Sequence, residues 1–265
     1  MMIPRTLTIA GSASQGSAGI QADLKTFEEF NVYGMSAVTA LVANNSITEQ
    51  GVFTQTAEAV EAQIHASMEH VGVDALKTGM LFTEPIIEKT ADLLEQYEGA
   101  PYVLDPVMIG KMGTQLLKDE AIESMRVRLI PKASVLTPNL QEAGKLLGGK
   151  VPETIMEMEE AAKKLHVLGP EYVLIKGGAL SDYPAVDLLY DGKEVTEYRS
   201  ERVDTIHTSG AGCTYSAAIT AGLAKGESVE EAVGEAKRFV TEAIRHALSF
   251  GRGIGSTYHA AYRLK

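Results

Sequence analysis

Short apolar runs alternate with longer amphipathic stretches along this chain, and this alternation limits the possible folds more than any other feature. Runs such as Leu7–Ala10, Tyr102–Leu104 and Tyr172–Lys176 are followed by glycine or polar residues, whereas segments 57–70 and 84–97 have helical length and periodicity. Strands and helices that alternate at this spacing form βαβ units, in which helices cover both faces of a parallel sheet. The sequence therefore predicts an α/β protein with a mostly parallel central sheet.

The length of the chain suits one large domain. Its 265 residues are 45% hydrophobic, enough for a sizeable core, and single α/β domains often reach about 250 residues. The most linker-like stretch, Gly148–Pro152, is better interpreted as the turn between two helices. We therefore predict a single domain over residues 1–265, with a hairpin over 187–201 and two helices after it.

Charge and cysteine content exclude several classes of function. The formal net charge of −11 argues against a nucleic-acid or anionic-membrane partner, because both favour a basic surface. No apolar run approaches the roughly 18 residues of a membrane span. A single cysteine cannot form an internal disulfide or a cysteine-based zinc site, and the six histidines lack ligand spacing. We expect a cytoplasmic protein with no nucleic-acid or membrane partner and no protein-bound transition metal.

Glycine and polar residues gather directly after the predicted strands. Ligands of parallel α/β sheets bind beyond the carboxyl ends of the strands, so residues at these positions can share one active-site edge. A structural protein would scatter such residues over both ends of the sheet. The residues that follow strands in this way are Gly11, Asn44, Gly79, Asp105, Asn139 and Gly177.

The segment Gly210-Ala-Gly-Cys213 precedes a small, apolar run over 217–224, as a turn before a buried helix would. A helix N-terminus presents unpaired N–H groups and the positive end of its dipole, and glycines let an anion approach them closely. The motif predicts a phosphate site and a lowered pKa for the Cys213 thiol. A second interpretation stays open at this point, because a lone cysteine is often a small core residue and Gly-x-Gly a common turn.

Six ordered motifs together resemble a known family. They are Gly11-Ser-Ala-Ser-Gln-Gly-Ser-Ala-Gly-Ile-Gln-Ala-Asp23, Lys77-Thr-Gly-Met80, Asp105-Pro-Val-Met108, Thr137-Pro-Asn-Leu-Gln-Glu142, Lys176-Gly-Gly178 and Gly210-Ala-Gly-Cys213. The chain is similar over essentially its whole length to the hydroxymethylpyrimidine/phosphomethylpyrimidine kinases of thiamine biosynthesis, within the ribokinase superfamily. A closely related branch of that family phosphorylates pyridoxal and pyridoxine.

The resemblance implies a fold, a reaction and cofactors. The fold would be a three-layer α/β/α sandwich of the ribokinase type, and ATP with Mg²⁺ would phosphorylate a hydroxymethyl group on a heteroaromatic ring. The expected acceptors are hydroxymethylpyrimidine and its monophosphate, and pyridoxal or pyridoxine is the alternative. A further alternative is a relative that binds nucleotide or vitamin without turnover. Family members are commonly dimers, so a homodimer is expected.

The resemblance also assigns roles at the phosphate end. The N–H groups of Gly210, Ala211, Gly212 and Cys213 would bind the transferring phosphoryl group, with the thiol taking the proton of the acceptor hydroxyl. The expected ATP-phosphate contacts are Lys176, Asn139 and Thr208. Asp105 and Glu142 would hold Mg²⁺, the latter through water, although Asn139 and Glu142 also have the spacing of a helix capping box.

For the acceptor ring, the resemblance points to a set of residues near the first four predicted strands. They are Gly11, Ala18, Asp23, Asn44, Met80 and Val107. Two other interpretations stay open here, because Met80 could be ordinary core and Asp23 an exposed residue of a first helix turn. Residues 111–114 are interpreted as a flap that closes over the site and excludes water.

The chain departs from the family pattern at several positions that bear on the acceptor. Ala13 stands where aspartate is usual, and Asn44 stands where pyrimidine kinases usually carry glutamine. Ala211 is commoner in the pyridoxal branch, but the flap sequence Gly110-Lys-Met-Gly113 lacks the second cysteine that members of that branch often have there. Ser209 replaces a histidine that is usual in both branches. The pyrimidine acceptor remains our first prediction.

Overall fold

The computed structural model describes residues 3–110, 115–180 and 183–264. In this part of the chain, nine strands form one sheet in the order β3-β2-β1-β4-β5-β6-β7-β8-β9. The strands are β1 (Arg5–Ala13), β2 (Tyr33–Val42), β3 (Val52–Thr54), β4 (Ala75–Thr78), β5 (Tyr102–Leu104), β6 (Val135–Leu136), β7 (Tyr172–Lys176), β8 (Ala185–Tyr190) and β9 (Val195–Ser200). The six neighbouring strands from β2 to β7 are parallel, whereas β3, β8 and β9 each pair antiparallel to a neighbour.

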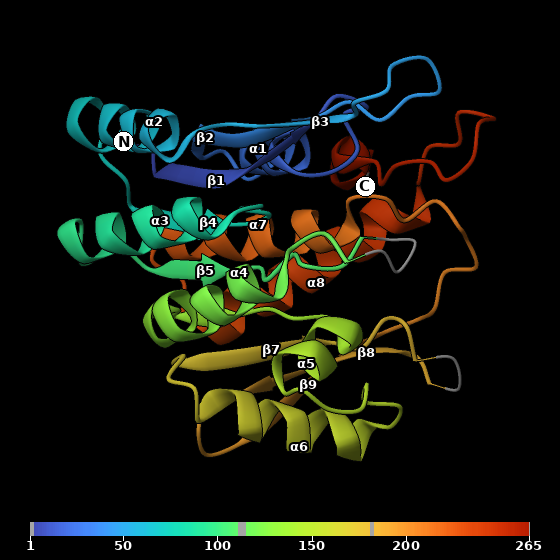
Figure 1. Ribbon diagram of the computed structural model, residues 1–265. Helices are drawn as coiled ribbons and strands as arrows, with labels where there is room; N and C mark the ends of the chain where they lie inside the picture. Colours follow the sequence, from blue (N-terminus) through green and yellow to red (C-terminus); the bar gives the residue numbers. More distant parts are fainter. Residues whose placement is uncertain (1–2, 111–114, 181–182, 265) are drawn as a thin grey trace.

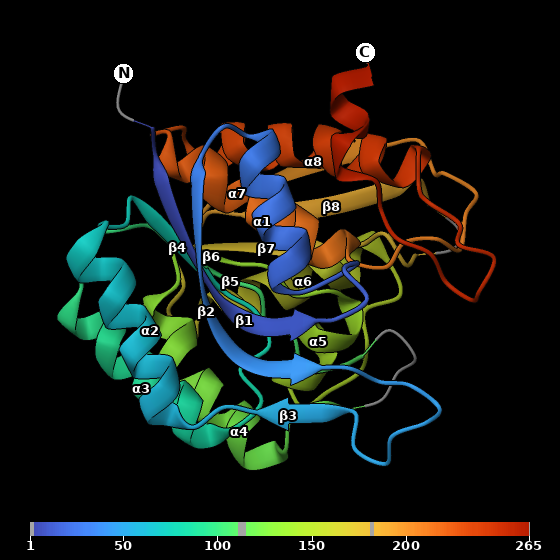
Figure 2. The same cartoon turned by 90° about the horizontal axis from the view of Figure 1, so that it is seen from above.

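Helices cover both faces of this sheet (Figures 1 and 2). The α-helices are α1 (Ile20–Glu29), α2 (Ala57–His70), α3 (Glu84–Gln96), α4 (Asp119–Ser124), α5 (Leu140–Leu146), α6 (Ile155–His166), α7 (Ala211–Ala224) and α8 (Val229–Arg245). Three short turns of other helix types are η1 (Met125–Leu129), η2 (Ile130–Lys132) and η3 (His259–Leu264). Helices α1, α7 and α8 pack together on one face, and α2 to α6 lie on the other.

Two hydrophobic clusters, one on each face, hold these layers together. On one face, Phe27 of α1 and Phe239 of α8 pack with the small residues of α7. On the other, Ile64 and Ile86 belong to a larger cluster that reaches from α2 to α6. Helix α7 is buried from Thr214 to Leu223, which explains why its sequence is small and apolar all round.

The strand order changes direction at β1. The chain passes from β1 to β2 on one side, and then returns to place β4 on the other side of β1. A crevice for ligands forms at such a switch point, outside the carboxyl ends of the two strands. In this protein Gly11 lies near the carboxyl end of β1 and Gly79 directly follows β4, and the Gly79 N–H donates to the Ile9 carbonyl at 3.0 Å.

The structure confirms the predicted three-layer α/β/α fold with a mostly parallel sheet. The hairpin is present as β8 and β9, and residues 148–152 connect two helices as expected. Strand β3 and the segment from α4 to η2 were not predicted, because their short runs carry little periodicity. Among the helices of the described residues, none has the length and apolar character that crossing a membrane requires.

Candidate active site

The turn before α7 can hold only a glycine at its central position. Gly210 has a φ of +84° and caps the N-terminus of α7. A Cβ added to it would lie 1.7 Å from the carbonyl oxygen of Ser17, and 3.5 Å from Cα of Ala18. The loop after β1 therefore packs directly on this turn, and it brings Ala18 beside the predicted phosphate site.

Two N–H groups of the first turn of α7 point out of the helix without an intrahelical acceptor. The first helical bond runs from the Thr214 N–H to the Gly210 carbonyl at 2.8 Å, so the N–H groups of Gly212 and Cys213 precede the helical ladder. The Ala211 N–H donates to the Thr208 carbonyl at 3.2 Å. The Ala211 N–H thus has a partner within the turn, and its predicted contact with a phosphoryl group stays a prediction.

Lys176 brings a positive charge to the same place. Its Nζ lies 2.8 Å from Oδ1 of Asp105, and a Cβ added to Gly212 would be 3.5 Å from that Nζ. Burial lowers the pKa of Lys176, but the carboxylates of Asp105 and Glu142 raise it by more. The side chain is therefore a permanent ammonium group beside the positive end of α7.

Asp105 follows β5 and is buried beneath α7. In addition to Lys176, it accepts a hydrogen bond from Oγ of Ser216 on α7 at 3.0 Å and a weak one from Thr137 at 3.4 Å. The carboxylate thus joins β5, β7 and α7 near the predicted metal and phosphate site. Both of its oxygens have partners within the protein.

Glu142 and Asn139 form the capping box that their spacing allowed. The Asn139 N–H donates to Oε2 of Glu142 at 2.8 Å, and the Glu142 N–H donates to Oδ1 of Asn139 at 2.9 Å. Burial raises the pKa of Glu142 to about 8, with Lys176 opposing and Asp105 adding to the shift. The capping interpretation is confirmed, and it places a buried carboxyl group beside Lys176 and Asp105.

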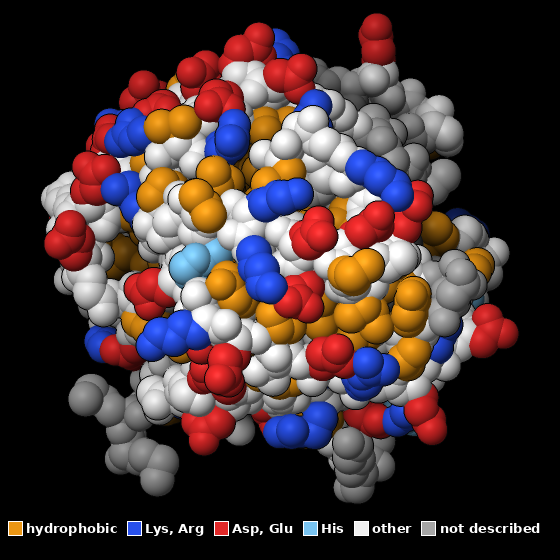
Figure 3. Space-filling model, turned by 90° about the horizontal axis from the view of Figure 1, so that it is seen from below, with side chains coloured by type: hydrophobic (Ala, Val, Ile, Leu, Met, Phe, Trp, Pro, Cys, Tyr) orange, Lys and Arg blue, Asp and Glu red, His pale blue; other side chains and the backbone are white. Residues whose placement is uncertain are grey.

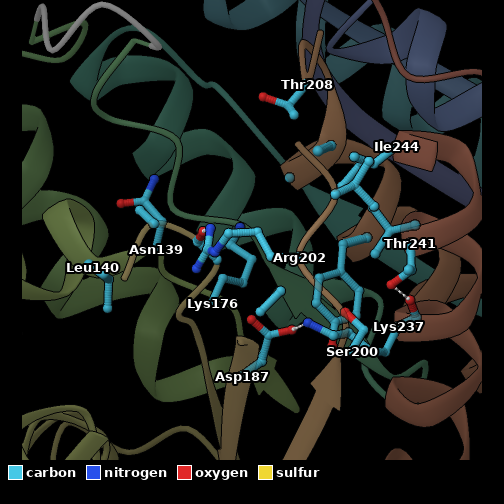
Figure 4. A pocket seen from close by; sticks show the side chains of 18 of the residues that line it. Asn139, Leu140, Lys176, Asp187, Ser200, Arg202, Thr208, Lys237, Thr241 and Ile244 are labelled. Carbon is cyan, nitrogen blue, oxygen red and sulfur yellow. Dashed lines mark hydrogen bonds and ion pairs between the residues drawn. The ribbon is translucent and has the colours of Figure 1, made fainter. Parts of the chain in front are cut away.

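A cavity of about 550 Å³ opens beside this cluster. Figure 4 shows Asn139 and Lys176 on one side of it, Thr241 and Ile244 of α8 on the other, and Thr208 near the turn before α7. The residues predicted for the nucleotide phosphates, Lys176, Asn139 and Thr208, all line this cavity, as do Ala211 and Gly212. None of the residues predicted for the acceptor ring lines it.

A buried ion pair forms part of the cavity wall. Lys237 of α8 lies 2.6 Å from Oδ2 of Asp187, whose other oxygen accepts the Gly177 N–H at 2.9 Å. The pair joins α8 to β8 and fixes Gly177, which directly follows Lys176 at the end of β7. On the outer surface shown in Figure 3, Lys and Arg side chains are interspersed with Asp and Glu rather than gathered in one patch.

Cys213 is in the first turn of α7, but its thiol does not have the predicted low pKa. The Gly19 N–H donates to its Sγ at 3.4 Å. Burial raises the pKa of the thiol from 9.0 to about 11, although Lys77 acts in the opposite direction. Desolvation outweighs the helix N-terminus here, so the prediction of a thiolate in the ligand-free protein is wrong.

Gly11 and Met80 meet at the switch point between β1 and β4. A Cβ added to Gly11 would lie 3.3 Å from the methyl group of Met80. Met80 also packs against the larger core cluster, as the core interpretation expects, and its contact with an acceptor ring stays a prediction. Val107 lies shortly after Asp105 and is half-buried. Asn44 is exposed in the loop after β2. It packs closely on Gly51, since a Cβ added to Gly51 would lie 2.3 Å from Oδ1 of Asn44.

Asp23 is not an exposed residue of a first helix turn. It is fully buried, with Oδ1 2.9 Å from Nζ of Lys77 and Oδ2 accepting the Thr8 hydroxyl at 2.6 Å. Both oxygens are paired inside the protein, and the predicted contact of Asp23 with an acceptor ring stays a prediction. The predicted flap at residues 111–114 lies outside the described residues, although its neighbours Ile109 and Gly110 line the cavity.

Sequence reasoning assigned no role to Lys77 or Ser216. Lys77 is completely buried, and Asp23, Cys213 and Asp105 all raise its pKa, against the effect of burial. The sequence did indicate a buried ion pair, because a lysine within the apolar run Ala75–Thr78 needs a buried partner of opposite charge. Ser216 gave no signal, since serine is ordinary in a buried helix of small residues.

Comparison with known proteins agrees with this architecture. A family model described as phosphomethylpyrimidine kinase matches residues 13–258. The chain is 48% identical to pyridoxine kinase of Bacillus subtilis, over 100% of this chain and 98% of that protein. It is 46% identical to hydroxymethylpyrimidine/phosphomethylpyrimidine kinase of Streptomyces coelicolor, over 97% of this chain and 94% of that protein.

A solved structure is similar over the whole chain. The ADP complex of Bacillus subtilis pyridoxal kinase superimposes with a TM-score of 0.93 at 46% identity, and the match covers 100% of both chains. The similarity therefore includes the sheet, both helical layers and the turn before α7.

Proposed function

Because the chain belongs to the phosphomethylpyrimidine kinase family, we propose that it transfers the γ-phosphoryl group of ATP to the hydroxymethyl group of hydroxymethylpyrimidine and of its monophosphate. The observation that carries the proposal is the meeting of three features at one place. The free N–H groups of Gly212 and Cys213, the ammonium group of Lys176 and the 550 Å³ cavity adjoin one another.

Phosphoryl transfer depends mainly on positioning and on stabilising negative charge. The N–H groups of Gly212 and Cys213 are rigid, because α7 is buried and Gly210 is fixed against Ser17. Lys176 is held by Asp105, so its charge requires little rearrangement when the phosphoryl group arrives. These groups bind and orient the phosphoryl group while it moves between nucleotide and acceptor.

The cavity suits a nucleoside triphosphate. Its lining includes the ammonium group of Lys176 and the backbone of Gly212 as well as the apolar side chains of Val203, Val240 and Ile244. We assign the phosphates to the former and the base to the latter. The structurally similar Bacillus subtilis protein is an ADP complex, which supports a nucleotide in this cavity.

The carboxyl groups near Lys176 fit a magnesium ion that is held largely by water and nucleotide. Among the described residues, no cluster of three or more His, Cys, Asp or Glu side chains could bind a metal directly. Asp105 is paired with Lys176 and Ser216, and the Glu142 carboxyl group accepts backbone hydrogen bonds from Asn139 and Met108. Glu142, with Asp105 behind it, would hold hydrated Mg²⁺, which neutralises phosphate charge when bound.

Cys213 is the proposed proton acceptor for the hydroxymethyl group. Its thiol is neutral at rest, because burial keeps its pKa near 11. Lys77 is the neighbouring cation that favours the thiolate. The thiol thus stays protonated until bound substrates change its surroundings. Base catalysis supplies roughly a 10²- to 10⁴-fold increase in rate, and we expect Cys213 to contribute at most the lower part of this range.

Phosphorylation of pyridoxal or pyridoxine is the second candidate function. The 48% identity to the Bacillus subtilis pyridoxine kinase and the TM-score of 0.93 to a pyridoxal kinase favour it. Ala211 points the same way. The rest of the proposal, a single-domain homodimer in the cytoplasm that uses Mg²⁺, applies equally to both acceptors.

Release of ADP by the purified protein tests the proposal directly. Hydroxymethylpyrimidine, its monophosphate and pyridoxal are compared in parallel with ATP and Mg²⁺. Turnover of both pyrimidines with slower use of pyridoxal supports the first function, and turnover of pyridoxal without the monophosphate supports the second. Binding of ATP and a ring compound without ADP release would identify a non-catalytic relative and overturn both.

A further inference from the structure

Phe82 has an unusual backbone conformation at the end of β4. It and Asn31 are the non-glycine residues with positive φ in the described chain, at +66° and +55°. The Thr83 N–H donates to the Leu81 carbonyl at 2.8 Å, so Phe82 is the centre of a three-residue turn. A turn of this kind with positive φ is the rare and strained form, and asparagine tolerates positive φ far better than phenylalanine.

The neighbours of Phe82 hold it in this conformation. The Met80 carbonyl accepts the Thr39 hydroxyl at 2.7 Å, and the side chain of Leu81 is fully buried in the core. The chain is thus anchored immediately before Phe82. Strain that surrounding structure enforces in this way is often found at ligand sites.

The strained turn directs the phenyl ring toward β1. A Cβ added to Gly11 would lie 3.1 Å from Cε2 of Phe82 and 3.3 Å from the methyl group of Met80. The ring therefore lies against the end of β1, beside Met80, where the strand order changes direction. It is only half-buried, unlike Leu81, so the turn does not serve to place this ring in the core.

We propose that Phe82 is a specificity-determining residue of the acceptor site, an inference that rests on the proposed function. Its ring forms the apolar wall against which the heteroaromatic ring of the acceptor packs. Sheets of this kind bind ligands beyond the carboxyl ends of the strands at a switch point, and aromatic rings prefer one another's faces and edges. The strained turn keeps this wall in place without help from the substrate.

Three substitutions at Phe82 distinguish the effect of its phenyl ring from the effect of its strained backbone. Phe82→Leu keeps apolar volume, Phe82→Ala removes the ring but keeps the strain, and Phe82→Gly removes both. Asn31→Gly is the matched control, because it relaxes a positive φ far from the switch point, at the end of α1. Steady-state KM for each acceptor and for ATP, together with Tm, is measured for all four variants.

We expect Phe82→Ala and Phe82→Gly to raise the acceptor KM about 5- to 10-fold, the size of a lost aromatic contact, with ATP KM within twofold. Phe82→Leu falls between them and the wild type. The ratio of kcat/KM moves toward pyridoxal, because removing the wall makes room for the bulkier ring. Asn31→Gly leaves every kinetic constant unchanged, and Phe82→Gly has a Tm at or above that of Phe82→Ala.

The inference is overturned if Phe82→Ala leaves the acceptor KM unchanged, raises the ATP KM equally, or leaves the ratio of kcat/KM between the two acceptors unchanged. Any of these results would show that Phe82 has a structural role only. Failure of the proposed function is recognised separately, since it is the wild type that then releases no ADP. In that case, titration calorimetry with hydroxymethylpyrimidine and pyridoxal still compares wild type and Phe82→Ala. Weaker binding by the variant supports the inference, and equal binding or none by the wild type contradicts it.

Discussion

The Nζ atom of Lys176, at the end of β7, lies 2.8 Å from Oδ1 of Asp105, the residue that follows β5. Both side chains are largely shielded from solvent, and the pair lies directly under the first turn of α7. An ammonium group held this way faces Gly212 with little freedom to move. The pair therefore links the stability of the fold to the charge of the phosphate site.

Replacement of Lys176 by methionine should reduce both stability and activity. Breaking a buried pair costs about 3–5 kcal/mol, because it leaves Asp105 charged and without its partner. We expect kcat to fall by about 10²-fold or more, since a positioned positive charge is lost. The free energy of unfolding in urea and the rate of ADP release measure the two effects.

Two further variants sharpen this prediction. The double variant Lys176→Met with Asp105→Asn should recover most of the stability but not the activity, because no unpaired charge remains. Lys132→Met removes a surface pair with Glu95 and should change neither quantity by much. Wild-type kcat in Lys176→Met would contradict the assigned role.

Gly210→Ala and Gly226→Ala test the turn before α7 against a matched position. Both glycines have a φ of +84°, but a Cβ on Gly226 meets nothing within 4 Å, whereas one on Gly210 would overlap the Ser17 carbonyl. Each variant should lose about 1–2 kcal/mol from the left-handed conformation. Gly210→Ala should lose more stability, and it alone should lose phosphoryl transfer. If both variants were equally stable and equally active, the steric constraint that we assign to the Ser17 carbonyl would be contradicted.

Glu142→Gln should raise the Mg²⁺ concentration needed for half-maximal activity. Residues that act on a metal through water typically affect its affinity by about 10- to 100-fold. Glu231→Gln is the control, because Glu231 forms the same kind of capping box with Ser228 on α8. Glutamine preserves a capping box, so both variants should keep a near wild-type Tm. An Mg²⁺ requirement that shifts equally in both would show that Glu142 only caps α5.

The ligand-free thiol of Cys213 should react slowly with iodoacetamide at pH 7 to 8. The folded pKa is about 11 against 9.0 for an ordinary thiol, so the neutral form is the one favoured by folding. Its contribution to stability is complete below about pH 9 and is lost as the pH rises toward 11. The chain has a single cysteine, so mass spectrometry follows the reaction without ambiguity. Alkylation in urea should be at least roughly tenfold faster at pH 8, and a native thiol that titrates below pH 7 would contradict this prediction.

Local sequence patterns predicted the layers of the fold and the edge where the site lies. The apolar run at Tyr172–Lys176 and the helical period over 57–70 each depend on residues that are close in sequence. Glycine at position 210 likewise indicated a tight turn before a helix. These features require no knowledge of which strands are neighbours, and the structure contains all of them.

Pairings across the sheet were not accessible in the same way. Lys77 and Asp23 are 54 residues apart, and they meet only because β4 lies beside β1 and α1 covers that junction. The same packing shields the half-buried Cys213 from water, and this desolvation reverses the expected shift of its pKa. The turn before α7 also pairs the Ala211 N–H with the Thr208 carbonyl.

The sequence by itself determined the α/β architecture, the family, and the glycine turn and lysine of the phosphate site, because periodicity and short motifs act over neighbouring residues. Only the tertiary structure decided which charges are paired, that the Cys213 thiol is neutral, and that Phe82 is held against Gly11. Burial and long-range pairing depend on the order of strands in the sheet, and the energies of buried charges change most with that environment.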